Sequence, residues 1–223
     1  MAVPRNFDSI ILDVDGTLYR QAPVRLRIAI RLAAACITQP LRTRRAIRAI
    51  RAFRESLEKL RSTPGSDQPA EQLRLTAKRT KMPEAHVRSL IEEWMFERPL
   101  DLVGGFPQKG LHRFLRLAIQ HEVRLGVFSE YPAAGKLESL GVREPFAAVV
   151  SSFDPEVRRF KPDPAGFLHA AQLLGSSPGR TLVIGDRDDA DGAGARAAGM
   201  QYLRIGGRDF PSFEPLCGHL FED

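Results

Sequence analysis

Short apolar runs that alternate with helical segments constrain the fold of this chain most. The runs are rich in valine, isoleucine and leucine and end in glycine or polar residues, as buried strands do; they lie at residues 9–13, 124–129, 147–151, 181–185 and 201–205. Segments of helical character lie beside them, at residues 110–120, 133–140, 163–174 and 191–198. Strands that alternate with helices predict a parallel sheet covered on both faces, so we expect an α/β fold.

A long helical block interrupts this alternation directly after the first strand. Between about residues 21 and 98 apolar residues recur at spacings of three and four, as at Ile50, Phe53 and Leu57. We therefore expect an α/β core domain formed by residues 1–19 and 101–223, and an all-helical domain inserted at residues 20–100.

The charge of the chain is concentrated in this insertion. The formal net charge is +6, yet the segment from Arg20 to Arg61 alone holds eleven arginines and one lysine against Glu55 and Glu58, a local net of +10. Such a segment suits an anionic substrate, a membrane surface or nucleic acid. Because no aromatic residues are interleaved with these arginines, we expect no nucleic-acid partner.

Several protein classes are disfavoured by what the sequence lacks. It contains only two cysteines, Cys36 and Cys217, so no disulfide framework is expected. No apolar run approaches the roughly 20 residues that span a bilayer, and no signal peptide is recognisable. We expect a cytoplasmic protein without a membrane span, either a monomer or a homodimer.

Polar side chains follow four of the predicted strands, at the sheet edge where ligands bind in open parallel sheets. In chain order they are Asp13 and Asp15, then Ser129 and Glu130, then Lys161, then Asp186 with Asp191. Residues two apart in an extended chain point to the same side, so we expect Asp13 and Asp15 to lie together. With Asp186 they would present three carboxylates to one point, the oxygen ligands that Mg²⁺ prefers.

This set of side chains indicates phosphoryl chemistry. Gly16 allows the backbone to turn tightly beside a ligand. Ser129 and Lys161 suit phosphate oxygens, while one of the two early aspartates attacks phosphorus and the other protonates the leaving oxygen.

The motifs Asp13-Val14-Asp15-Gly16-Thr17-Leu18, Ser129, Lys161-Pro162 and Gly185-Asp186 with Asp191, in this order, resemble the four motifs of the haloacid dehalogenase-like (HAD) hydrolase superfamily. The helical insertion resembles the C1 cap of its phosphoglycolate phosphatase and β-phosphoglucomutase branch. The resemblance implies a Rossmann-like parallel core, Mg²⁺ as cofactor and a small phosphorylated metabolite as substrate.

The resemblance also implies roles for matching residues. Asp13 would be the nucleophile that forms an aspartyl-phosphate. Asp15 would be the general acid and then the base, and would bind Mg²⁺ through its backbone carbonyl. Asp13 and Asp186 would ligate the metal, while Asp191 ligates or supports it. The phosphate-binding residues would be Ser129, Lys161, Gly16 and Thr17.

Some expectations leave alternatives open. Either Asp189 or Asp191 supports the metal; the longer spacing favours Asp191. Glu130 departs from the small residues usual after Ser129, and would either point away or contact the substrate. Arg20 is our candidate for a cap residue near the substrate. The alternative functions are a phosphosugar mutase of the same family and a non-catalytic protein whose basic cap binds an anion or partner.

Overall fold

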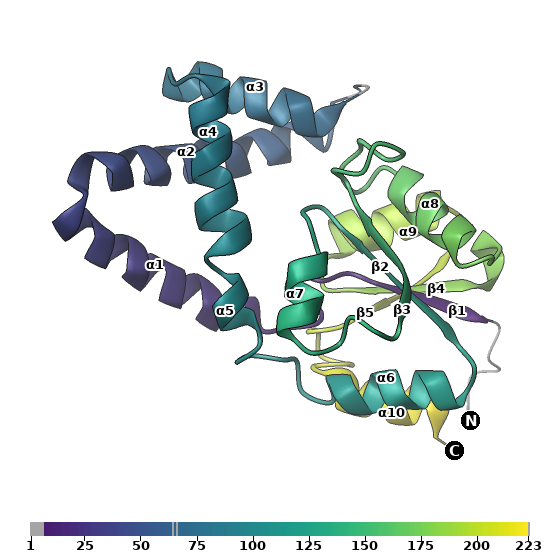
Figure 1. Cartoon of the computed structure of the whole chain (residues 1–223). Coiled ribbons are helices and arrows are strands. Elements are labelled where there is room, and N and C mark those ends of the chain that lie inside the picture. The colour runs from purple at the N-terminus through teal and green to yellow at the C-terminus, as the bar shows by residue number, and fades with distance from the viewer. Residues whose placement is uncertain (1–6, 64, 66, 223) are drawn as a thin grey trace.

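A single parallel sheet forms the centre of the protein (Figure 1). The computed structural model describes residues 7–63, 65 and 67–222. Five strands lie in the order β3-β2-β1-β4-β5, with bounds β1 Ser9–Leu12, β2 Arg124–Ser129, β3 Phe146–Ser151, β4 Thr181–Gly185 and β5 Gln201–Arg204. All four neighbouring pairs run parallel, which confirms the predicted α/β class.

The alternation of side chains along β1 explains why both faces of the sheet are covered. Ile10 and Leu12 point to one face, where they pack into a cluster with residues of α6 (Leu111–Gln120) and α10 (Phe213–Phe221). Ile11 points to the other face and packs with residues of α8 (Ala165–Leu173) and α9 (Ala193–Ala197). Figure 1 shows these two helix pairs on opposite sides of the sheet. Because all three β1 side chains are fully buried, the strand lies at the centre of the core.

Helix α10 is an element that we did not predict from the sequence. It begins after Ser212, whose Oγ accepts a hydrogen bond from the amide of Glu214. Phe213, Leu216 and Leu220 recur at helical spacing on its buried side, and the Phe213 ring lies 4.7 Å from that of Phe114. The Ser212 cap and the helical spacing of the apolar residues are both local features of the sequence.

Helices joined by short non-helical segments form the described part of the predicted insertion. Its elements are α1 Gln21–Thr38, α2 Pro40–Leu60, α3 Gln68–Thr80, α4 Glu84–Ile91, a π-helical segment Glu92–Glu97 and α5 Leu100–Val103. Helices α2, α3 and α4 share a hydrophobic cluster that includes Phe53, Leu73 and Leu90. The boundary expected after residue 100 falls inside α5, and Leu102 and Val103, which lie on the core side of that boundary, pack into the cluster that contains Ile10 and Leu12. No described helix combines the length and apolarity needed to cross a membrane.

Polar and aromatic contacts hold the insertion against the core. The Gln68 amide donates to the carbonyl of Arg158, and the Gln68 side-chain oxygen accepts from the amide of Phe160. Tyr131, just beyond β2, accepts a hydrogen bond from Gln72 at 3.2 Å and stacks on Phe53 with ring centroids 5.9 Å apart. These contacts fix helices α2 and α3 over the carboxyl edge of the sheet.

Two helical glycines provide a matched test of core packing. A Cβ at Gly166 in α8 would lie 2.1 Å from the buried Phe128 ring, whereas a Cβ at Gly218 in α10 would meet nothing within 4 Å. We expect Gly166→Ala to lower the free energy of unfolding by about 1–3 kcal/mol, because Phe128 must move. Gly218→Ala should raise it by about 0.5–1 kcal/mol, because alanine favours a helix. Urea unfolding measures both; equal effects would contradict this packing.

Candidate active site

Asp13 directly follows strand β1 and so lies at the carboxyl edge of the sheet. Its amide donates to the carbonyl of Ile184 at 2.9 Å, which continues the pairing with β4 by one residue. The carboxylate is buried: Oδ1 accepts a hydrogen bond from Lys161 Nζ at 2.7 Å, while Oδ2 has no hydrogen-bond partner in the described part of the chain. One oxygen of Asp13 is therefore held in place and the other is available to a ligand or a substrate.

Lys161 is a buried cation shared by two acids. Its Nζ also donates to Asp191 Oδ1 at 2.7 Å, and its side chain lies beside the rings of Phe128 and Phe167, 5.0 and 5.5 Å from their centroids. Burial alone would lower the pKa of Lys161, but the Asp13 and Asp191 carboxylates outweigh it and raise the pKa. The ammonium thus stays charged and orients both acids.

Three carboxylates converge beside this lysine. Asp13, Asp186 and Asp191 each offer one oxygen, and these oxygens lie within 4.8 Å of one another. Burial, together with the charges of the neighbouring acids, raises the pKa of Asp13 to about 8 and that of Asp186 to about 6. A divalent cation would offset this repulsion, and three carboxylates form the all-oxygen donor set that fits Mg²⁺.

Asp189 and Asp191, the two candidates for supporting the metal, lie in different environments. Asp191 is 2% exposed, and its Oδ2 accepts from the amide of Arg187 at 3.1 Å. The Asp189 side chain is 69% exposed and pairs with the Arg187 guanidinium. Only Asp191 therefore lies within the three-acid group.

Gly16 and Thr17 line the turn that follows Asp15. Gly16 has φ +100°, and a Cβ there would lie 2.4 Å from Asp186 Oδ2, so only glycine lets the turn approach this acid. The Thr17 hydroxyl is buried and has no partner among the described residues. Ser129, at the end of β2, is 1% exposed, and its Oγ accepts only a long bond of 3.4 Å from the Tyr131 amide.

Asp15 lies apart from the three-acid group, contrary to the expectation that its side chain joins Asp13 and Asp186. Its Oδ1 accepts from the Tyr19 hydroxyl, and its Oδ2 accepts from Lys136 Nζ at 2.5 Å. The reason is that the turn at Gly16 ends the extended chain, while Tyr19 and Lys136 supply donors on another side. Burial would raise the pKa of Asp15, but Lys136 and Tyr19 together hold it below its ordinary value.

Sequence reasoning missed Lys136 and Tyr19. Lys136 lies in α7 (Ala134–Ser139), where it is 4% exposed. A single lysine in a short helix is usually at the surface, so the sequence carries no signal for its burial. Tyr19 directly follows the Asp13 to Leu18 motif, and that proximity was the only available indication.

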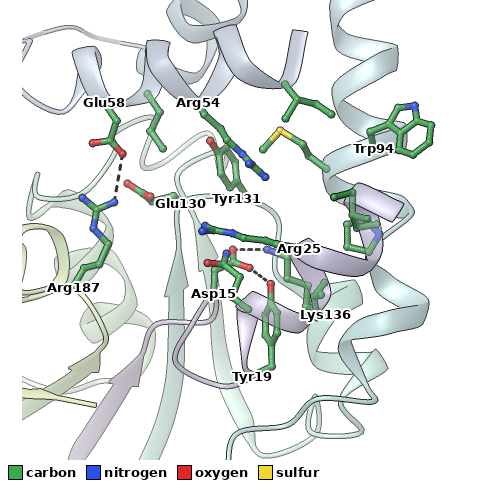
Figure 2. A pocket seen from close by; sticks show the side chains of 18 of the residues that line it. Asp15, Tyr19, Arg25, Arg54, Glu58, Trp94, Glu130, Tyr131, Lys136 and Arg187 are labelled. Atoms are coloured by element: carbon green, nitrogen blue, oxygen red, sulfur yellow. Dashed lines mark hydrogen bonds and ion pairs between the residues drawn. The ribbon is translucent and has the colours of Figure 1, made fainter. Parts of the chain in front are cut away.

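A cavity of about 460 Å³ lies between the sheet edge and the helices of the insertion (Figure 2). Asp15, Lys136 and Asp186 are among the residues that line it. Figure 2 shows Arg54 of α2 pointing down into the cavity and Arg25 of α1 extending across it next to Asp15. Within the described residues, neither arginine forms an ion pair or hydrogen bond. Burial and the nearby Arg25 charge lower the pKa of Arg54. This unpaired positive charge favours an anionic occupant.

Glu130 and Arg20 are the two remaining residues that the sequence suggested for contact with the substrate. Glu130 turns to the insertion, where its Oε2 accepts from Arg61 at 2.7 Å. Burial raises the pKa of Glu130 to about 7, although Arg61 opposes the shift. Arg20 is exposed, lies 5.8 Å from the Phe106 ring centroid and is not among the residues that line the cavity, so the cavity gives no support to its expected place near the substrate. Arg25, more than a turn further along, is the α1 arginine that faces the cavity.

Comparison with known proteins places this geometry in a family. Residues 7–199 match the family described as haloacid dehalogenase-like hydrolase. A stretch of 80 residues is 40% identical to the glyceraldehyde 3-phosphate phosphatase of Methanopyrus kandleri, which is 36% of this chain but only 34% of that protein. The phosphoglycolate phosphatase of Shigella boydii is 27% identical over 221 residues, 86% of this chain and 81% of that one.

The fold agrees with this match. The β-phosphoglucomutase of Clostridium difficile superposes with a TM-score of 0.62 at 19% identity, over 96% of this chain and 88% of that one. The family match begins just before β1 and ends just after α9, so it contains every motif residue gathered at the sheet edge. The chain therefore belongs to the haloacid dehalogenase-like hydrolase family.

Proposed function

We propose that this protein hydrolyses a small phosphate monoester in a Mg²⁺-dependent reaction through an aspartyl-phosphate. The observation that carries the proposal is the state of Asp13: Lys161 holds one carboxylate oxygen, and the other is buried with no partner in the described part of the chain, next to Asp186 and Asp191. A carboxylate held in this way is oriented for nucleophilic attack.

The proposed reaction has two steps. Asp13 Oδ2 attacks phosphorus, the bond to the ester oxygen breaks, and the leaving oxygen takes a proton from Asp15. Asp15 then accepts a proton from water, whose oxygen attacks the aspartyl-phosphate, releasing inorganic phosphate and the free Asp13 carboxylate. The Lys136 contact, which favours the charged form of Asp15, suits the base of the second step.

The surrounding residues would hold the phosphoryl group. Lys161 offers positive charge, and Ser129 and Thr17 offer hydroxyls with little or no competition from protein partners. Asp13, Asp186 and Asp191, with the backbone carbonyl of Asp15, would hold Mg²⁺, which supplies positive charge that offsets the charge of the phosphate.

We further propose that residues 20–100 act as a cap that selects the substrate. Arg25 and Arg54 face the cavity without counter-ions among the residues that the structure describes, so they attract an anionic molecule and are neutralised by it. The cavity volume suits a small metabolite. The matched relatives support the substrate class, since the names glyceraldehyde 3-phosphate phosphatase and phosphoglycolate phosphatase both specify small phosphate monoesters.

Replacing the nucleophile tests the first step. Asp13→Asn should lower phosphate release by about a thousandfold or more on any active member of a panel of small phosphate monoesters, because an amide does not attack phosphorus. Circular dichroism checks that the fold is retained. Retained turnover would refute Asp13 as nucleophile, and an isomerised sugar phosphate in place of inorganic phosphate would identify a mutase.

The metal assignment predicts a contrast between two nearby acids. Chelation should abolish activity and added Mg²⁺ should restore it. Asp186→Asn should raise the Mg²⁺ concentration for half-maximal activity by roughly tenfold or more, because it removes a ligand from the three-acid group. Asp189→Asn is the matched control and should leave that concentration unchanged, since its side chain faces solvent. Equal responses would contradict the assignment.

Lys136 is proposed as a positioning residue that acts through Asp15. Lys136→Met removes the charge that lowers the pKa of Asp15, so that pKa rises and any limb of the pH–rate profile governed by Asp15 moves to higher pH. Lys136→Arg should restore most of the wild-type profile. The control is Lys109→Met, whose exposed side chain pairs with Glu214. A fall in rate without a shift in pH would mean that Lys136 has only a structural role.

A further inference from the structure

Helix α1 is apolar on two opposite sides. One side faces the protein: Val24 is buried, and Ile28 and Leu32 line the cavity. The opposite side is exposed and consists of Leu26, Ile30, Ala33, Ala34 and Ile37, which we call the α1 outer face. Leu26, Ile30 and Ile37 are 63%, 60% and 84% exposed, so three large apolar side chains stand in solvent on one helix.

No charge interrupts the α1 outer face. Leu26, Ile30, Ala33 and Ile37 follow one another at spacings of four, three and four, so they share a side of the helix, whereas Arg27 and Arg31 border that side next to Ala34 and Arg25 lies on the cavity side. The strip runs from Leu26 to Ile37, so it is roughly 17 Å long, and α1 contains no acid. A continuous exposed strip of this kind marks an interaction site.

The apolar strip continues into a basic corner. Figure 1 shows α1 and α2 meeting at a corner far from the sheet. Leu41, in the first turn of α2, is 69% exposed there, and Arg44 and Arg45 are also exposed. Neither arginine forms an ion pair or hydrogen bond with any residue that the structure describes. The corner thus combines apolar side chains with unneutralised positive charge.

We propose that the α1 outer face and this corner dock on an anionic lipid surface. The apolar side chains would enter the boundary between headgroups and acyl chains, while Arg44 and Arg45 contact lipid phosphates. Charge selects this occupant over a second copy of the chain, because pairing two copies would bring together two segments of net charge +10. An anionic lipid surface supplies the negative charge that the corner lacks.

Docking also orients the active site. The cavity lies on the opposite side of α1 from the outer face, so docking would hold it about a helix diameter, roughly 10 Å, from the lipid surface. The docking itself does not depend on the proposed reaction.

Vesicle sedimentation of the whole protein tests the proposal. We expect binding to vesicles of equal parts phosphatidylglycerol and phosphatidylcholine, little binding to phosphatidylcholine alone, and weakening at about 0.5 M salt. Ile30→Glu with Ile37→Glu should lower the partition coefficient by roughly tenfold or more. Arg44→Gln and Arg45→Gln should lower it by roughly fivefold each.

The matched control places the same charges on exposed apolar residues elsewhere. Ile119→Glu with Leu173→Glu alters α6 and α8, where these side chains are 56% and 55% exposed, and should leave vesicle binding unchanged. Thermal unfolding checks that each variant is folded. The proposal fails if the wild-type protein does not bind anionic vesicles. It also fails if the variant of the α1 outer face and the control variant bind these vesicles equally. A wild-type dimer that Ile30→Glu with Ile37→Glu dissociates, without vesicle binding, would assign the face to a second copy instead.

Discussion

The Lys161 ammonium, buried between Asp13 and Asp191, is the interaction on which the rest of the site depends. Removing a cation from water costs several kcal/mol unless acids compensate it, and here two carboxylates do so at 2.7 Å each. The three residues come from the segments that follow β1, β3 and β4. The buried Lys161 ammonium therefore holds three segments of the chain together, although nothing in their local sequences fixes their relative positions.

Close packing then fixes where that charge lies. Lys161 rests beside Phe128 and Phe167, and Gly166 allows the Phe128 ring to approach α8. A Cβ at Gly185 would lie 2.4 Å from the Asp191 carboxylate, so glycine is required there too. Gly166 and Gly185 therefore allow the close packing that fixes the position of the Lys161 ammonium. The same arrangement leaves Asp13 Oδ2 as the oxygen without a protein partner.

The parts of this structure that the sequence predicts are those governed by local pattern. Buried strands, their order along the chain and the polar residues at their ends follow from short-range periodicity, and all five strands were predicted with bounds close to those observed. The contact between Lys136 and Asp15 joins residues 121 positions apart, and only the packing of α7 creates it. Arg25 replaces Arg20 at the cavity for a similar reason, since the direction of α1 decides which of its arginines faces inward.

The arginines of the insertion have several different physical roles, which the net charge of the segment does not distinguish. Some arginines neutralise acids, as Arg31 does with Asp101 and Arg42 with Glu93. Arg25 and Arg54 face the cavity, whereas Arg44 and Arg45 face solvent at the far corner. Paired arginines add little to the field outside the protein, because an adjacent acid cancels it. The attraction for anions therefore comes from the unpaired ones, among which Arg25 and Arg54 lie in the cavity, whereas Arg44 and Arg45 lie at the exposed corner between α1 and α2.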